Sequence, residues 1–296
     1  AIFGSRASNG VIIITTKKGQ AGLQVNFSAN MYINTPRTYA QVMNGDQLRA
    51  YVVNRYGADS KQAQSLGTYN TNWQKEVLRT SVSSDYNLSV GGKVGVVPFR
   101  VAVSYTNNNG IIRTTKMDRV TGSINITPKF FNDLFSVNAN VKGAYISNRY
   151  EQGALGGAVC FNPTLPVHME NVFNNWTTYT ADGSLATKDT KGNEISDLYA
   201  INPASVLFDY NCTSKVWQSV GNLQIDLKMP FLTDLRANLN LGYEYNKGNV
   251  NNYNLPFSPN AWKSGHYIPP VKDDPSTLER KVDGYANRNY EKQTRY

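Results

Sequence analysis

The feature that most constrains the fold of this chain is an alternation of apolar and polar side chains that recurs along its length. In residues 235–245 every second position is apolar or aromatic, and the positions between them are Arg, Asn, Gly or Glu. Successive side chains of a β-strand point to opposite faces, so a period of two predicts a strand with one apolar and one polar face. Six further stretches share this period: residues 23–33, 86–90, 99–105, 124–126, 135–145 and 223–227.

The connections between these stretches are alternately short and long. The short ones are residues 92–97, 130–134 and 230–234, and the long ones are residues 34–83, 106–118, 148–215 and 246–287. Two of the short ones resemble each other, because FFNDL and FLTDL each place an aromatic residue at a strand end and an Asp in the turn. An antiparallel meander with tight turns at one rim and long loops at the other produces this pattern, which is typical of transmembrane β-barrels.

A soluble β-sandwich also has strands with one apolar face, so the alternation alone does not distinguish it from a membrane barrel. The lengths of the strands and loops decide between these two fold classes. Strands of about eleven residues exceed the five or six that are usual in soluble domains and match a strand that spans a membrane. Long loops beside five-residue turns are also uncommon in compact domains. The sequence contains no run of 18 apolar residues, so no transmembrane helix is expected. We therefore expect an all-β fold, a transmembrane antiparallel barrel.

The charge of the chain argues against nucleic acid as a partner. The formal net charge is +9, but charged residues make up only 17% of the chain. Lys and Arg are scattered, with no basic run beyond the pairs at 17–18 and 280–281. This favours a solubilising excess of charge, or contact with anionic lipid headgroups or anionic solutes. Cys160 and Cys212 are far apart in polar stretches, and both a disulfide and two free thiols fit the sequence.

The long connections contain two segments with helical periodicity. Residues 45–56 space Leu48, Tyr51, Val52 and Tyr56 at intervals of three and four, with Asp46 as the expected N-cap. A second short helix is expected within residues 71–78, where Trp73 and Val77 share a face. Both helices are interpreted as packing elements of an outer loop.

Catalytic and metal-binding patterns are not found. The chain has two histidines, His168 and His266, and neither has a second ligand at metal-binding spacing. No Ser-His-Asp set, nucleotide-binding loop followed by Lys, or CxxC motif is present. We expect no enzyme activity, no cofactor and no metal.

FGSRASNGVIIITTKKG at residues 3–19 resembles the end of the plug domain in one known family, the SusC/RagA-type TonB-linked outer-membrane transporters. YNLSVGG at 86–92 resembles the entry to its second barrel strand, SYTNNNGII at 104–112 its next hairpin, and NPTLPVH at 162–168 a Pro-rich stretch of an outer loop. The similarity is strongest over residues 1–20 and 72–147.

The resemblance implies an internal piece of a plugged barrel of about 22 strands. Residues 1–19 would be the end of the plug, with its last strand at 11–18. Residues 20–296 would be the first part of the barrel, with seven full strands and the beginning of another at 289–296. The four long connections would be extracellular loops.

The resemblance also implies a function. Members of this family take up oligosaccharides, and sometimes peptides, across the outer membrane of Gram-negative-type cells. Their partners are a SusD-like surface lipoprotein that acts as a lid, the TonB-ExbB-ExbD complex that supplies energy, and the surrounding outer-membrane lipid. A secreted β-sandwich for binding or adhesion and a passive porin-like barrel remain the alternatives, and the segment at 3–19 disfavours both.

The candidate substrate-binding residues are aromatic residues of the long loops, because aromatic faces stack on sugar rings. For each of them the alternative is loop packing or an interfacial aromatic girdle. The candidates are Trp176, Tyr179, Tyr199, Tyr210, Trp262 and Tyr267.

Overall fold

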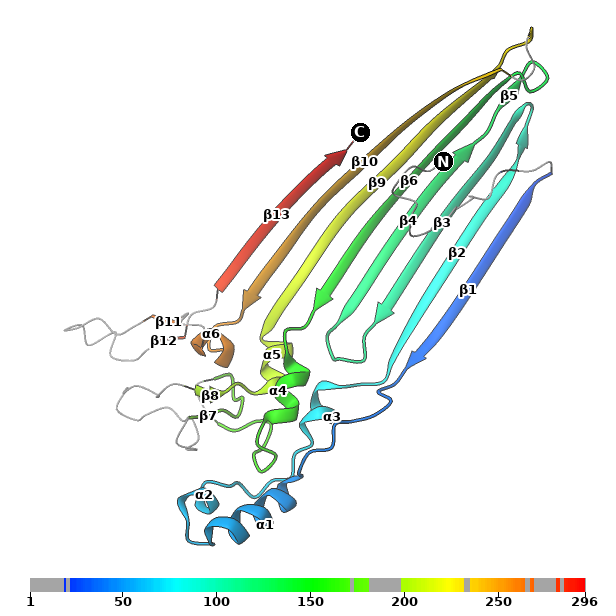
Figure 1. Cartoon of the computed structure of the whole chain (residues 1–296). Helices are drawn as coiled ribbons and strands as arrows, with labels where there is room; N and C mark the ends of the chain where they lie inside the picture. The colour runs from blue at the N-terminus through cyan, green and yellow to red at the C-terminus, as the bar shows by residue number, and fades with distance from the viewer. Residues whose placement is uncertain are drawn as a thin grey trace.

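The computed structural model describes residues 19, 22–170, 173–180, 198–231, 235–263, 267–268, 281–282 and 285–295. Its main element is a single antiparallel sheet with the strand order β1-β2-β3-β4-β6-β9-β10-β13, and the short β5 pairs with the beginning of β6. The strands lie side by side in one layer, and the helices gather at one end of it (Figure 1). The expected all-β, partial-barrel fold is confirmed.

The strands of the main sheet are β1 (Gln24–Asn34), β2 (Ser81–Val94), β3 (Val97–Asn109), β4 (Lys116–Ile126), β5 (Lys129–Phe130), β6 (Phe135–Tyr150), β9 (Tyr210–Lys228), β10 (Arg236–Asn254) and β13 (Tyr285–Arg295). The helices are α1 (Gly45–Tyr56), α2 (Lys61–Gln64), α3 (Trp73–Val77), α4 (Ala154–Cys160), α5 (Pro203–Phe208) and α6 (Pro259–Lys263). Two small ladders complete the described elements, β7 (Tyr179–Thr180) with β8 (Leu198–Ala200) and β11 (Tyr267–Ile268) with β12 (Lys281–Val282). None of the described helices has both the length and the apolar character needed to cross a bilayer.

Each of the seven segments expected from the alternation lies in a strand of the main sheet, and the strand whose beginning the resemblance implies at 289–296 is β13, but several strands run further than expected. β9 and β10 each have 19 residues. β3 ends at Asn109 and β4 begins at Lys116, so the connection expected at 106–118 is a turn at 110–115. The residues added to β3 at 106–109 are all Thr or Asn, and most of those added to β10 at 246–254 are Asn, so polar side chains on both faces hide the period of two in these segments.

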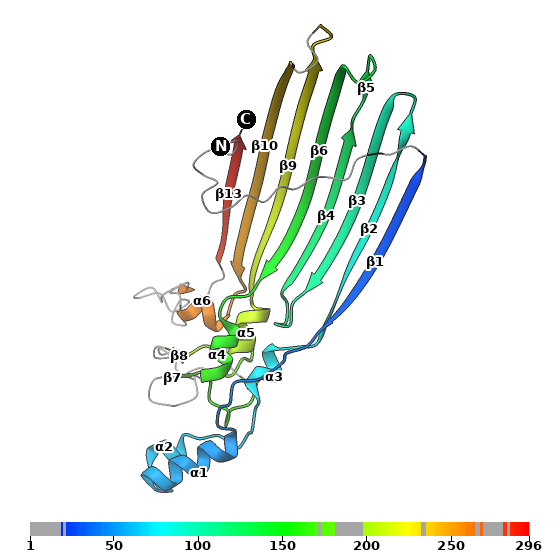
Figure 2. The same ribbon diagram turned by 45° about the vertical axis from the view of Figure 1, so that its right-hand side comes forward.

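Tight turns join the strands at the end of the sheet away from the helices (Figure 2). Between β5 and β6, Phe131, Asn132 and Asp133 adopt consecutive left-handed conformations, with φ of 55°, 53° and 69°. Lys129 Nζ lies 2.7 Å from Asp133 Oδ2 across this turn. The similar turn between β9 and β10 includes residues 232–234, which lie outside the described residues.

Cross-strand pairing aligns the apolar side chains in continuous rows on one face of the sheet. One row crosses seven strands and consists of Val25, Val90, Val101, Ile124, Val141, Gly221 and Tyr243. The face stays open, since Leu239 is 51% exposed and Leu241 53%. Within the described residues no second layer covers it, so the packing that a β-sandwich requires is not found. This face is called the outer face below.

Aromatic side chains flank the apolar rows at both ends. Near the long loops, Tyr86 stacks on Tyr105 with ring centroids 6.5 Å apart, and the Tyr145 and Trp217 centroids are 4.7 Å apart. These rings belong to one row of the sheet. Near the tight turns the aromatic residues are Phe99, Phe130, Phe131, Phe135 and Phe231.

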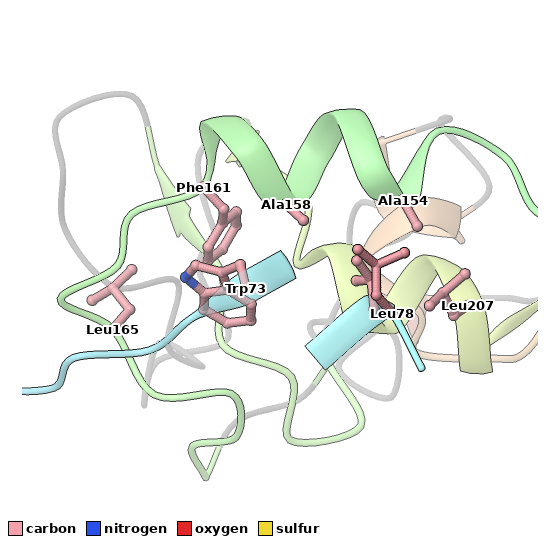
Figure 3. Packing of buried hydrophobic residues seen from close by; sticks show 8 residues of the cluster. Trp73, Leu78, Ala154, Ala158, Phe161, Leu165 and Leu207 are labelled. Carbon is pink, nitrogen blue, oxygen red and sulfur yellow. The ribbon is translucent and has the colours of Figure 1, made fainter. Parts of the chain in front are cut away.

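The buried apolar core lies among the loops and not against the sheet. Figure 3 shows α4 lying across α3 and α5, with Trp73 and Phe161 facing each other. Their ring centroids are 4.7 Å apart, and Trp73 Nε1 donates a 2.9 Å hydrogen bond to the Asn162 carbonyl. We call this the loop cluster; its core residues are Trp73, Val77, Leu78, Ala154, Ala158, Phe161, Leu165 and Leu207.

Both expected helices form. α1 spans residues 45–56 as expected, but its N-cap is Asn44 and not Asp46. Asn44 and Gln47 form a capping box in which each side chain accepts from the backbone N–H of the other, and Asp46 lies in the first turn. In α3, Trp73 and Val77 are both buried, so the predicted shared face is the one that packs. The strand expected at 11–18 lies outside the described residues, and the division at residue 19 stays a prediction.

Candidate functional site: a polar concave face beneath a loop cluster

The face of the sheet opposite the apolar rows is lined by uncharged polar side chains, chiefly Asn, Gln and Ser. Asn125, Asn140 and Asn222 lie in one cross-strand row. Neighbouring amides bond to one another: Asn125 Nδ2 donates to Asn138 Oδ1 at 3.0 Å, and Asn222 Nδ2 donates to Asn240 Oδ1 at 2.6 Å. The strands therefore present a sheet of hydrogen-bond donors and acceptors, in which charged side chains of both signs, such as Arg100, Lys142 and Glu244, are interspersed.

This polar face is hollowed at two places. One cavity of about 570 Å³ lies over β1 to β4 and β6, and its lining includes Asn26, Ser89, Arg100, Ser123 and Lys142. The other, of about 620 Å³, lies over β9, β10 and β13, and its lining includes Gln218, Asn246, Asn289, Glu291 and Gln293. We call this side the concave face. Its groups can bind a hydrated solute through many exchangeable hydrogen bonds.

A third cavity, of about 800 Å³, lies beside the loop cluster between segments 39–48, 70–74 and 158–163. Gln74 fixes one wall, because its side chain accepts from the backbone N–H of Ala40 and donates to the Ala40 carbonyl, both at 2.8 Å. The backbone N–H of Thr71 donates to the Pro163 carbonyl at 2.8 Å, which joins the first and third long loops. The sequence predicts only packing helices in this region and does not reveal the cavity, since no motif marks which loops meet. Its lining includes Tyr39, Asn44, Gln47, Asn70 and Cys160.

Two of the predicted aromatic site residues are buried in the loop region. Trp176 is 7% exposed, its ring lies 4.4 Å from that of His168, and it stacks on Phe208 with centroids 6.0 Å apart. Tyr210, the first residue of β9, is 4% exposed. For these two residues the structure favours loop packing, the alternative that the sequence left open.

The other four predicted residues are described only through their backbone. Tyr179 in β7 and Tyr199 in β8 belong to adjacent strands of one ladder, Trp262 lies in α6, and Tyr267 lies in β11. Their side chains lie outside what the structure describes, as does all of His266. A binding role for these four aromatic residues stays a prediction.

A buried carboxylate connects two of the long loops. Asp209 caps the end of α5, and its backbone carbonyl accepts from Leu255 N–H at 2.9 Å. Asn174 Nδ2 donates to Asp209 Oδ2 at 2.9 Å and to the Pro256 carbonyl at 3.0 Å. Burial raises the pKa of the Asp209 carboxyl above its ordinary value, although the Asn174 hydrogen bond acts in the opposite direction. This junction holds the third and fourth long loops together.

The cysteines are two free thiols, with Cys160 exposed and Cys212 buried. This settles the alternative that the sequence left open. Among the described residues, no three His, Cys, Asp or Glu side chains are grouped so that they could hold a metal ion.

No family model matches the chain. Among curated proteins, the chain is 37% identical to the TonB-dependent receptor SusC of Bacteroides thetaiotaomicron over 267 residues. The match covers 87% of this chain and 26% of that protein. It is 28% identical to the TonB-dependent receptor P3 of Formosa agariphila over 221 residues, a match that covers 70% of this chain and 20% of that protein. The chain thus spans between a fifth and about a quarter of the length of these relatives.

Solved structures share the fold. The RagAB peptide importer in the open-open state superposes with a TM-score of 0.62 at 18% identity, over 86% of this chain and 31% of the other. The RagAB peptide transporter gives a TM-score of 0.60 at 19% identity, over 87% of this chain and 32% of the other.

Proposed function

We propose, since the chain belongs to the SusC/RagA family of TonB-dependent receptors, that it forms part of the wall of an outer-membrane β-barrel through which nutrients are taken up. The outer face would contact lipid and the concave face would line the lumen. The long loops would lie outside the cell, as in outer-membrane barrels generally.

The observation that carries this proposal is the band of apolar rows, which has aromatic side chains near both of its ends. On β6 the outer face runs from Phe135 to Tyr145, ten residues later. At about 3.3 Å per residue and a tilt of about 40°, this stretch is roughly 25 Å tall. Outer-membrane barrels have an apolar band of about this height, with aromatic girdles at both interfaces.

The edges of the sheet support a larger closed barrel. Among the described residues, β1 pairs only with β2 and β13 only with β10. A strand edge that faces hydrocarbon leaves backbone N–H and C=O groups unpaired, each at a cost of several kcal/mol. Further strands must therefore cover these edges if the sheet lies in a membrane. A plugged barrel of about 22 strands fulfils this condition.

For the solute, we propose oligosaccharides. The concave face offers amide and hydroxyl groups that suit sugar hydroxyls. A second candidate is a peptide, which is favoured by the likeness of the fold to the RagAB peptide importer.

We also propose two kinds of partner. A SusD-like lipoprotein would act as a lid over the loops, where the cavity between the first and third loops offers a contact surface. The TonB-ExbB-ExbD complex would displace the plug with energy from the proton gradient. The proposed role is transport, with no chemical step.

The test is uptake by cells that carry the complete receptor. Labelled oligosaccharides and labelled peptides are offered separately, with and without an uncoupler of the proton gradient. We expect uptake of an oligosaccharide that the uncoupler abolishes. Uptake that persists in the uncoupler would indicate a passive pore, and uptake of peptides alone would favour the second candidate.

The role of the loop aromatic residues is tested in the same cells. Trp262→Ala and Tyr267→Ala should reduce uptake without reducing the amount of receptor in the outer membrane. The matched control is Tyr56→Ala, because Tyr56 is an exposed aromatic residue of α1 outside the candidate set. Unchanged uptake in both test variants would remove these residues from the binding surface.

A further inference from the structure

Four basic residues gather on the outer face at the end of the sheet nearest the long loops. They are Lys215 on β9, Lys247 on β10, and Arg288 and Lys292 on β13, and together we call them the basic patch. They lie at the level of the aromatic row that contains Tyr145 and Trp217, or just beyond it.

The strand register places the four cations close together. Trp217, Lys247 and Lys292 form one cross-strand row, and Lys215, Asn249 and Tyr290 form the next row on the same face. Arg288 pairs with Asn251 one row further along. Adjacent strands are about 4.8 Å apart, so three neighbouring strands bring these four charges into a small area.

No carboxylate balances these charges on their own face. Throughout the described strands β6, β9, β10 and β13, the acidic residues Asp226, Glu244 and Glu291 all belong to the opposite, concave face. β4 shows a different arrangement, because its outward Lys116 is 2.8 Å from Asp118. An anion from outside the chain would therefore complete the patch.

The patch surrounds a hollow floored by aromatic rings. The hollow has a volume of about 400 Å³, and its lining includes Tyr145, Lys215, Trp217, Lys247, Arg288 and Tyr290. Lys247 Nζ lies 5.6 Å from the centroid of the Tyr290 ring, and Lys292 Nζ lies 5.9 Å from that of Tyr245. Arg288 Nε donates to Asn251 Oδ1 at 2.8 Å, which orients its guanidinium group. These contacts hold the cations in place around the hollow on the outer face.

We propose that the basic patch binds the phosphate-bearing headgroup of an outer-leaflet glycolipid, whose acyl chains lie along the apolar rows of the same strands. This inference rests on the proposed membrane placement of the sheet. Lys and Arg at the interface attract anionic lipid headgroups, and Arg recognises phosphate through its planar fork of donors.

The continuity of the patch with the apolar rows selects a lipid over a free anion. Towards the tight turns, the same strands continue on the outer face with Tyr243, Leu241 and Leu223. A ligand with both phosphates and acyl chains would contact both regions at once. Inorganic phosphate would contact only the cations, in a site that is open to water and screened by salt.

The test is lipid binding by the complete receptor, with lipid A as the probe: a glucosamine disaccharide that carries two phosphates and several acyl chains. Receptor purified in a neutral detergent is titrated with lipid A, and bound lipid is counted by native mass spectrometry. The test variant is Lys215→Gln with Lys247→Gln. The matched control is Arg119→Gln with Lys142→Gln, which removes the same charge from the concave face of the neighbouring strands.

We expect the patch variant to bind lipid A at least about tenfold more weakly than the wild type, given the usual gain per basic residue at an anionic interface. The control variant should bind as the wild type does, and dephosphorylated lipid A should not distinguish the three proteins. Equal weakening in patch and control variants would overturn the proposal, as would full displacement of lipid A by millimolar inorganic phosphate.

Folding is scored on the same samples, by the shift in gel mobility that folded outer-membrane barrels show on heating. If all proteins fold as membrane barrels but the patch variant binds lipid A normally, this inference fails and the proposed function stands. If the wild-type receptor is not a membrane barrel, both fail.

Discussion

At the scale of single residues, Leu241 and its neighbour Asn240 should respond in opposite ways to the same substitution. Leu241 lies on the outer face near the middle of the apolar band, and Asn240 lies on the concave face. In the complete receptor, Leu241→Arg should cost about 2–4 kcal/mol because it places a charge near the bilayer midplane. Asn240→Arg should cost at most about 1 kcal/mol, the value of its bond to Asn222. The measurement is denaturant unfolding in lipid vesicles, and equal costs would refute the assignment of the faces.

Two glycines of the outer face form a second matched pair. A Cβ at Gly221 would overlap the ring of Tyr243, which lies over this glycine from the next strand, whereas a Cβ at Gly122 would meet nothing within 4 Å. Gly221→Leu should therefore displace the Tyr243 ring and break the 3.0 Å hydrogen bond between its hydroxyl and Ser219 Oγ. We expect a loss of about 1–3 kcal/mol in the free energy of unfolding. Gly122→Leu should be nearly neutral. Comparable unfolding free energies for the two variants would show that the Tyr243 ring moves without cost.

Single residues also show how far the sequence determines the candidate site. It identified Trp176 and Tyr210 as loop aromatic residues but not the neighbours that bury them, because His168 and Phe208 reach Trp176 only through folding. Likewise, Asp46 fits the statistics of an N-cap, yet the helix begins two residues earlier than that assignment requires and Asn44 forms the cap. Local patterns predict which residue types are present, whereas tertiary contacts decide which of them are available for binding.

At the scale of elements, the alternation predicts seven main strands, from β1 to β10, and their facing, because one side of each strand is apolar over the whole band; β13 has no such side and was expected only from the family resemblance. It does not predict strand ends. Residues 246–254 of β10 carry Asn on both faces, so nothing in their order distinguishes strand from loop. The short helices α4 and α5 were also missed, since their six or seven residues form too few turns to show a period.

The junction around Asp209 makes the loop region sensitive to pH. Because its pKa is raised in the folded protein, the folded state binds a proton more tightly than the unfolded chain does. The resulting stabilisation is complete below the ordinary carboxyl pKa of 3.8 and is lost as pH rises through the raised value. Hydrogen exchange at the Leu255 amide, which bonds to Asp209, should therefore become faster as pH rises, beyond the intrinsic chemical effect.

The matched variants separate this effect from general pH sensitivity. Asp209→Asn keeps an oxygen that accepts from Asn174 and should make protection of the Leu255 amide independent of pH. Asp59→Asn, at an exposed site before α2, should leave the dependence as it is in the wild type. The same pH dependence in Asp209→Asn would assign it to another group.

At the scale of the whole molecule, both edges of the sheet, at β1 and β13, are unpaired among the described residues, which limits what this chain can form alone. Refolded into phospholipid vesicles by itself, the 296-residue chain should not give a protease-resistant, heat-modifiable barrel, because β1 and β13 would expose unpaired backbone groups to lipid. The complete receptor under the same conditions should give one. A monomeric, protease-resistant product from the short chain would contradict the need for further strands.

The length of β9 and β10 has a consequence for the cell surface. Beyond Trp217, β9 continues for seven residues to Tyr210, which is roughly 23 Å of strand and about 17 Å of height at a 40° tilt. In the proposed membrane placement, this part of the sheet would rise above the bilayer as a collar, with the loop cluster at its rim. In that placement, a partner that docks on this rim would meet the loops well above the lipid headgroups.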